Sequence, residues 1–365
     1  MSSLILGIAV GLVRFGLDIP LPNYDLLIAH GTFMVCGFLG TVICLERAAA
    51  TSGRIALLLP AACGLGAVTQ YFYPLHGGGA WFFVAASLGL IWLYARVPVV
   101  NREGHFVQTA GAISWAVSNI LLVVEFPSYV IVPWWVGFLL FTVAGERLEL
   151  ARVRNPPRSA IAVFLGAVIL YGVGLVSGAL AFTLDADSQI RSDEHGDFLD
   201  ASLWYAGDAL VGIATIVVAV WFFRYDLALR ALRRPGLTRF SASCLLSGYV
   251  WLLAAGTVSL WQPGLIGGTP FDARLHAVFL GFVISMVFGH ALIIGPGVFG
   301  FSLSYHPFFY MPMVVLHASV ALRFAADLQH NYLWRRHSGI LAAVSIILFV
   351  GCVAAARVRA WRESA

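Results

Sequence analysis

Four histidines lie inside long apolar stretches of the sequence: His30, His276, His290 and His317. Ionisable side chains are costly to place in a bilayer, and those that occur there usually mark a binding site or an ion pathway. Imidazole is a common ligand of both heme iron and copper. We therefore take these four histidines as candidate metal ligands. The alternative for each is a structural hydrogen bond to a neighbouring helix.

The spacing of these histidines indicates that they do not all bind the same metal. His276 and His290 are fourteen positions apart, which in a straight α-helix brings the chain back to within about 40° of its starting direction but about 21 Å further along. Nitrogen–metal bonds are near 2 Å, so the two histidines cannot share one metal, and they serve separate centres unless one is structural. His30 and His276 are predicted at similar depths on helices running the same way, where they could bind one iron from opposite sides.

Three methionines stand four positions from a histidine, a spacing that places both side chains on one face of a helix. Met34 follows His30, Met286 precedes His290, and Met313 precedes His317. Thioethers combined with imidazoles suit Cu(I) or heme iron, so these methionines join the candidate metal ligands. The alternative is ordinary apolar packing.

Several arginines are predicted to lie near the outer side of the membrane, in the orientation that the loop charges described below indicate. Arg14, Arg274 and Arg323 could pair with the two propionates of a heme, because guanidinium binds carboxylate through two parallel hydrogen bonds. His337, at the outer mouth of the last apolar segment, completes the candidate cofactor-binding set with His30, His276 and His317. The alternative for the arginines is salt bridging to Asp208, Asp272 or the acidic loop 184–200.

The composition sets the class of protein that must position these residues. The 365 residues are 60% hydrophobic and only 11% charged, with a mean hydropathy of +0.87, whereas a soluble domain is about one quarter charged. We expect an all-α, polytopic membrane bundle with the lipid bilayer as its main partner. The excess of positive charge comes from arginines at helix ends, so nucleic acid is not expected. The five cysteines form no CxxC or CxxCH motif, which leaves a disulfide framework, a zinc site and covalent heme unsupported.

The apolar segments predict twelve membrane spans within a single transmembrane domain, residues 1–365. Each window holds about twenty mainly apolar residues, the length that crosses a hydrocarbon core. The windows are 2–19, 24–46, 54–73, 80–97, 107–126, 131–151, 160–183, 201–223, 240–261, 273–295, 308–328 and 338–358.

Loop charges orient these spans. Arginines gather in every second connection, between spans 2 and 3, 4 and 5, 6 and 7, and 8 and 9, and again in the C-terminal tail. The opposite side carries the acidic loop 184–200, in which six acids face one arginine. The positive-inside rule then predicts that both termini are cytoplasmic. No cleavable signal peptide is expected, because no basic segment precedes the first apolar run.

Two motifs connect the sequence to known families. Twelve spans with one histidine on the second and others on the tenth resemble the catalytic subunit of heme–copper oxidases, although the paired histidines of that family are missing. "AHGTFMVCGFLGTVICLERA", early, and "LHAVFLGFVISMVFGHALII", late, resemble the NnrS family of twelve-span proteins. The NnrS resemblance implies heme b, with copper as a second candidate metal, in the bacterial inner membrane. It also implies nitric-oxide or respiratory redox chemistry or nitrosative-stress protection, with NO or O2 as a gaseous ligand and quinol or cytochrome c as an electron donor.

Two other classes of function fit the same composition. Twelve spans are common among secondary transporters, and the "GPG" at Gly295–Gly297 could interrupt a helix at a substrate site. A cofactor-free assembly protein is the remaining class. A membrane oxidoreductase of this kind would contain heme, whereas a transporter or an assembly protein would not. The presence of heme therefore distinguishes the three classes.

Overall fold

The computed structural model describes all residues except 1, 52–53, 76, 100, 191–197 and 365. Within the described residues the chain is all-helical, without strands. Ten helical segments are long and apolar enough to cross a membrane, which indicates a multi-pass membrane protein. They occupy ten of the twelve windows expected from the sequence.

The other two windows hold shorter apolar helices, α1 (Ser2–Val13) and α5 (Ala80–Arg96). At 1.5 Å per residue, the twelve residues of α1 are about 18 Å long, well short of a bilayer core. Leu4, near the start of α1, packs with Ile346 and Phe349 in the middle of the last helix. As described, α1 therefore covers only part of the bundle's thickness.

The remaining helices follow the predicted windows closely, with breaks where the sequence supplies caps. Asn101 caps the start of its helix by accepting a hydrogen bond from the Glu103 N–H, and Gly300, with φ of +66°, ends another in the left-handed conformation that glycine favours. The helices are α4 (Leu58–Phe72), α6 (Arg102–Val123), α7 (Ser128–Ala151), α8 (Arg158–Ile190), α9 (Phe198–Tyr225), α10 (Ala228–Ala231), α11 (Leu237–Trp261), α13 (Ser285–Phe299), α14 (Tyr310–Leu328) and α15 (Tyr332–Ser364).

Two spans are built differently from the rest. The second begins with α2 (His30–Thr32), continues as a π-helix over Phe33–Leu39, and ends as α3 (Gly40–Ala49). The tenth begins with α12 (Gly268–His276), continues as a π-helix over Ala277–Ile284, and ends as α13. π-Helices are rare and occur mostly as single turns near functional sites. Here each follows a candidate histidine.

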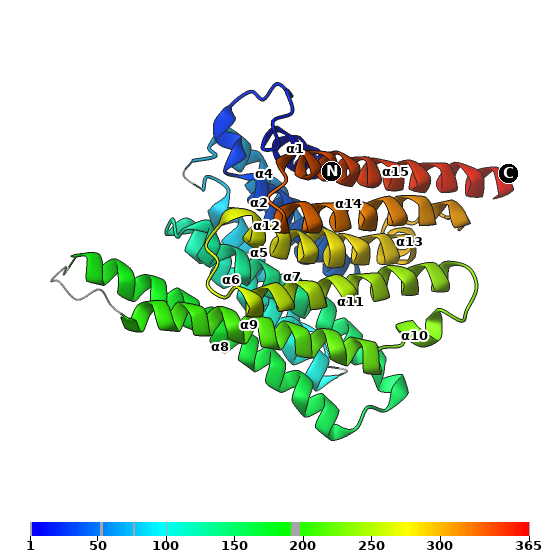
Figure 1. The fold of residues 1–365 in the computed structure, drawn as a ribbon. Helices are drawn as coiled ribbons and strands as arrows, with labels where there is room; N and C mark the ends of the chain where they lie inside the picture. The colour runs from blue at the N-terminus through cyan, green and yellow to red at the C-terminus, as the bar shows by residue number, and fades with distance from the viewer. Residues whose placement is uncertain (1, 52–53, 76, 100, 191–197, 365) are drawn as a thin grey trace.

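The helices pack mainly against their neighbours in sequence, α6 on α7, α8 on α9 and α14 on α15. In Figure 1, α9, α11, α13, α14 and α15 lie side by side, and the hairpin of α8 and α9 reaches beyond the helices next to it. The centrally packed helix is α7, which has the largest buried share of the ten. We call the end of the bundle where α12 begins the outer end, following the predicted orientation, and the opposite end the inner end. The acidic loop 184–200 lies partly outside the described residues.

Candidate functional site

His30 is held by α1, the short helix that leans on its span. Its Nδ1 lies 2.8 Å from the carbonyl oxygen of Gly7, so Nδ1 carries the proton and donates it. Gly11, one turn further along α1, leaves room for the ring, because a Cβ there would lie 2.9 Å from Cε1 of His30. Among the described residues, Nε2 of His30 has no hydrogen-bond partner. A lone pair therefore remains on that nitrogen.

His276 ends α12, directly before the second π-helix. Its Nδ1 lies 3.0 Å from the carbonyl oxygen of Asp272 and 3.3 Å from the Asp272 carboxylate. Arg323 Nη2, a donor, lies 3.4 Å from the same nitrogen, and the two nearer acceptor oxygens favour a proton on Nδ1. In the described part of the chain, Nε2 of His276 is likewise without a hydrogen-bond partner. A histidine that donates from one nitrogen to a carbonyl or carboxylate is the arrangement found for most metal-ligating histidines.

The fold places these two histidines within electrostatic range of each other. His30 interacts electrostatically with His276, Asp272 and Arg14, although 246 positions separate the two histidines in the sequence. They come from the two spans that contain π-helices. Arg14, which is exposed, also lies within electrostatic range of His30, and the pairing of His30 with His276 at one iron stays a prediction.

Asp272 also belongs to a buried ion-pair network that fixes the His276 end of α12. It accepts hydrogen bonds from Arg323, through Nε at 2.8 Å, and from Arg335 at 3.1 Å. Asp327, fully buried, pairs with the same two arginines. Two carboxylates and two guanidinium groups balance in charge, as buried ions require. Phe15 covers the network, with its ring centre 4.3 Å from the guanidinium of Arg323.

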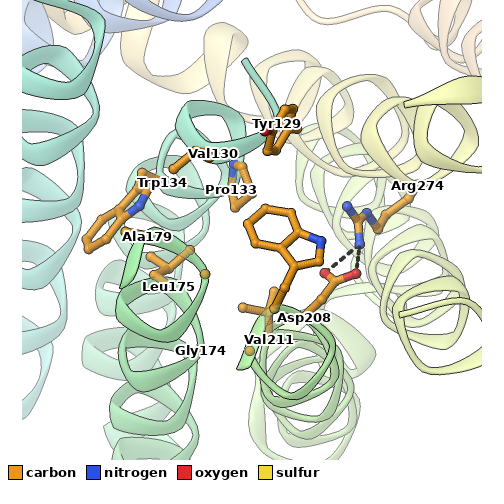
Figure 2. Close-up of a pocket in the computed structure, with 13 residues that line it drawn as sticks. Tyr129, Val130, Pro133, Trp134, Gly174, Leu175, Ala179, Asp208, Val211 and Arg274 are labelled. Atoms are coloured by element: carbon orange, nitrogen blue, oxygen red, sulfur yellow. Dashed lines mark hydrogen bonds and ion pairs between the residues drawn. The ribbon is translucent and has the colours of Figure 1, made fainter. Parts of the chain in front are cut away.

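Arg274 is paired as well, on another side of α12. Its Nη1 lies 2.6 Å from both carboxylate oxygens of Asp208 and 3.1 Å from the Ser259 hydroxyl. Figure 2 shows this pair at the wall of a cavity of about 30 Å³ among Trp134, Trp204 and other apolar side chains of α7, α8 and α9. That volume is room for small molecules such as water and far below that of ordinary ligand pockets. For Arg274 and Arg323, the structure shows the salt-bridge alternative.

His317 lies in a closed hydrogen-bond network on α14. Its Nδ1 accepts from the Trp251 indole N–H at 3.0 Å, so its proton sits on Nε2. Nε2 lies 2.8 Å from the Ser247 hydroxyl and 3.2 Å from the Ser285 hydroxyl. Both ring nitrogens are occupied by protein partners. Gly281 permits this network, because a Cβ there would collide with the Trp251 ring.

His290 also uses both of its nitrogens. Nδ1 donates to the Met286 carbonyl oxygen at 2.8 Å, and Nε2 accepts from Arg147 Nη2 at 3.1 Å. The predicted partnership of His290 with Met286 therefore runs through the backbone and not through sulfur. A nitrogen whose lone pair accepts from a guanidinium has none to offer a metal.

The remaining candidates take other places. Met34 packs its sulfur against Gly7, and Met286 packs its methyl against Gly248. Met313 is partly buried against the apolar cluster around α13 to α15, and His337 is exposed near the start of α15. In the part of the chain that the structure describes, no three His, Cys, Asp or Glu side chains are grouped to hold a metal ion.

The donor chemistry at His30 and His276 fits heme iron better than a bare ion. A bare ion usually needs about four protein ligands, whereas in heme the porphyrin supplies the equatorial nitrogens and the protein only the axial ones. Two Nε2 lone pairs, each with Nδ1 held by an oxygen, satisfy that smaller requirement. Arg14 is the predicted propionate partner that keeps no ion pair within the described residues, whereas Arg274 and Arg323 are engaged by carboxylates.

A family model described as a domain of unknown function, DUF8744, matches residues 1–358. The chain belongs to this family. No curated protein matches the sequence. Because the DUF8744 description states no activity, the function is inferred from the residues of the site.

Sequence reasoning gave too little weight to two groups of residues. Asp327 and Arg335 complete the ion network, and the signal was available: Asp327 stands four positions after Arg323 in an apolar span, a helical ion-pair spacing. Arg147 and Trp251 hold His290 and His317. Nothing local marks these contacts, since each joins residues at least 66 positions apart.

Proposed function

We propose that the protein is a heme-binding membrane protein in which His30 and His276 would hold one heme b. The observation that supports this proposal is that two imidazoles from the two π-helical spans lie within electrostatic range of each other, and that each has Nδ1 held by an oxygen and no protein partner at Nε2 among the described residues. Heme would supply redox and gas-binding chemistry. The chain's own part is to hold the two rings in place and to neutralise one propionate through Arg14.

The setting of this function is also part of the proposal. The chain would lie in the bacterial inner membrane with twelve apolar helical segments, of which α1 and α5 are the short ones, and with both termini in the cytoplasm, as the loop charges predict. Quinol or cytochrome c would be the electron donor, and NO or O2, the gaseous ligand that the NnrS resemblance implies, would have to replace one of the two histidines. The proposal assigns no ligands to copper, because His290 and His317 spend both nitrogens on protein partners.

The test is an optical spectrum of the purified full-length protein with metal analysis. We expect a Soret band that shifts and sharpens on dithionite reduction, with stoichiometric iron. His30→Ala and His276→Ala should each remove the band or convert it to a different ligation state, whereas His337→Ala, at an exposed position, should leave it unchanged. A colourless wild-type protein, or unchanged spectra in both ligand variants, would exclude the assignment.

A secondary transporter is the second candidate, and one observation favours it. Four charged side chains meet inside the membrane spans at Asp272, Asp327, Arg323 and Arg335, and such groups often lie on transport pathways. The "GPG" segment gives no support, because α13 continues through Pro296 to Phe299. A transporter would be colourless, so the same spectrum separates the two functions.

A further inference from the structure

A second cluster of buried polar groups lies toward the inner end, away from the proposed heme. It is built from Arg147 of α7, Tyr249 of α11, His290 of α13 and Asp226, which lies between α9 and α10. Asp226 is 1% exposed, Tyr249 0% and Arg147 8%. Helix α11 packs against α9, α10 and α13, and α7 packs against α9; Figure 1 shows α11 between α9 and α13.

Three atoms in this cluster are unsatisfied. Arg147 Nε, Asp226 Oδ2 and Tyr249 Oη are buried, and none has a hydrogen-bond partner of normal geometry among the described residues. The three side chains are neighbours, because the Tyr249 hydroxyl and the Asp226 carboxyl interact as donor and acceptor outside normal hydrogen-bond geometry, and Arg147 interacts electrostatically with both. An unsatisfied buried polar atom costs about 1–3 kcal/mol, so three in one place call for a common partner.

The chemistry of the three atoms identifies that partner. Arg147 Nε–H can only donate, Asp226 Oδ2 as a carboxylate can only accept, and the Tyr249 hydroxyl can do both. An anion that suited Arg147 would face the carboxylate, and a cation that suited Asp226 would face the guanidinium. Water both donates and accepts and carries no charge. Buried waters typically make about three such bonds to protein groups that lack other partners.

Other atoms of the Arg147 and Asp226 side chains already have protein partners. Asp226 Oδ1 accepts from the Ala228 N–H at 2.7 Å, starting α10. Arg147 Nη2 donates to His290. Arg154 donates to the Asp226 carbonyl oxygen at 2.8 Å and fixes the turn. Burial raises the pKa of the Asp226 carboxyl above its ordinary value, against the lowering effect of Arg147 and Arg154.

We propose that Arg147, Asp226 and Tyr249 form an internal water-binding site near the inner end of the bundle, in which water bridges the guanidinium to the carboxylate. Through Arg147, the bridge also fixes the orientation of His290. The site is independent of heme and of the choice between a redox protein and a transporter.

Hydroxyl-radical footprinting tests this site in the intact protein. X-rays generate radicals from water, and only side chains next to water, bulk or bound, are oxidised efficiently. Tyr249 has a matched control in Tyr171, which is 1% exposed and whose hydroxyl donates to the Pro133 carbonyl oxygen at 3.1 Å. Mass spectrometry should show Tyr249 oxidised several-fold faster than Tyr171. Equal, slow oxidation of both tyrosines would overturn the proposal.

Two variants assign the water to Asp226. Asp226→Asn keeps an acceptor oxygen and should retain the fast oxidation of Tyr249. Asp226→Leu removes the acceptor and should lower it to the level of Tyr171 within the same sample. If the Leu variant does not accumulate, the wild-type comparison still decides. Fast oxidation of Tyr249 in a folded Leu variant would show that Asp226 does not hold the water.

Discussion

His276 and His290 belong to one span, yet their imidazoles meet opposite environments. At the outer end, oxygens of Asp272 surround Nδ1 of His276 and leave Nε2 without a protein partner among the described residues. Further in, Nε2 of His290 accepts from the guanidinium of Arg147. The first arrangement leaves a lone pair for iron, and the second uses it. The partner of the second nitrogen therefore separates a candidate ligand from a structural histidine.

The largest expected effect concerns the network that holds the His276 end. Arg323→Met would leave Asp272 and Asp327 with Arg335 alone, and loss of one partner from a buried ion pair costs about 3–5 kcal/mol. Thermal unfolding in detergent should show a large drop in Tm. Arg359→Ala, which breaks an exposed pair with Glu363, is the control and should cost about 1 kcal/mol or less. Similar losses in both variants would mean that the network does not stabilise the outer end.

Gly11 offers a way to disturb His30 without altering it. A Cβ at position 11 would lie 2.9 Å from Cε1 of His30, so Gly11→Ala should displace the ring and lower the Soret absorbance per protein several-fold. Gly172→Ala is the matched control, because a Cβ there meets nothing within 4 Å. A normal spectrum in Gly11→Ala would argue that the position of the His30 ring does not matter for heme.

Replacing His290 or His317, the histidines deeper in the bundle, should change stability and not heme content. His290→Ala removes the acceptor of Arg147, and His317→Ala that of Trp251, so each should cost about 1–3 kcal/mol of stability. Heme content per folded protein should be unchanged in both. Loss of heme in the His290 variant equal to that in His276→Ala would contradict the division between the two ends.

The smallest effect is expected at Asp226 and depends on pH. Burial raises the pKa of this carboxyl in the folded protein, so the folded state binds the proton more tightly than the unfolded chain. Stability then falls as pH rises from the unfolded pKa, about 3.9, through the raised folded pKa. Asp226→Asn, which keeps the bond to the Ala228 N–H, should therefore raise Tm at pH 7. The gain should vanish at low pH; a gain that is constant with pH would indicate another cause.

Much of the architecture could be predicted because hydropathy is a local property. An apolar run of about twenty residues must satisfy its own backbone in lipid and therefore becomes a helix. The ten membrane-length helices follow from this rule. The rule did not reveal that α1 and α5 are short. The ends of an apolar segment in the sequence show where polar residues begin, and not where the helix itself is capped or broken.

The candidate site was predictable in its residue types and only partly in its contacts. Placing His30 and His276 on parallel spans was enough to suggest a pair. The arithmetic for His276 and His290 assumed a uniform α-helix, but the intervening π-helix closes i to i+5 bonds and changes the rotation per residue. The outer arginines could be identified from the sequence. Asp208 and Asp272, which pair with Arg274 and Arg323, lie on other helices, so the sequence alone could not separate a heme propionate from a salt bridge.

The sequence by itself determined the class of this protein: its helical nature, its membrane-length spans and the small set of ionisable residues within them. Those features follow from the transfer energies of the residues in each segment. Only the tertiary structure decided which imidazole nitrogen keeps a lone pair, which arginine meets a carboxylate, and where π-helices follow a histidine. Such outcomes depend on atoms contributed by helices far apart in the chain, as when Arg147 reaches His290 across 143 positions. Hydrogen bonds act over a few ångströms in space, and no local pattern encodes which residues will be that close.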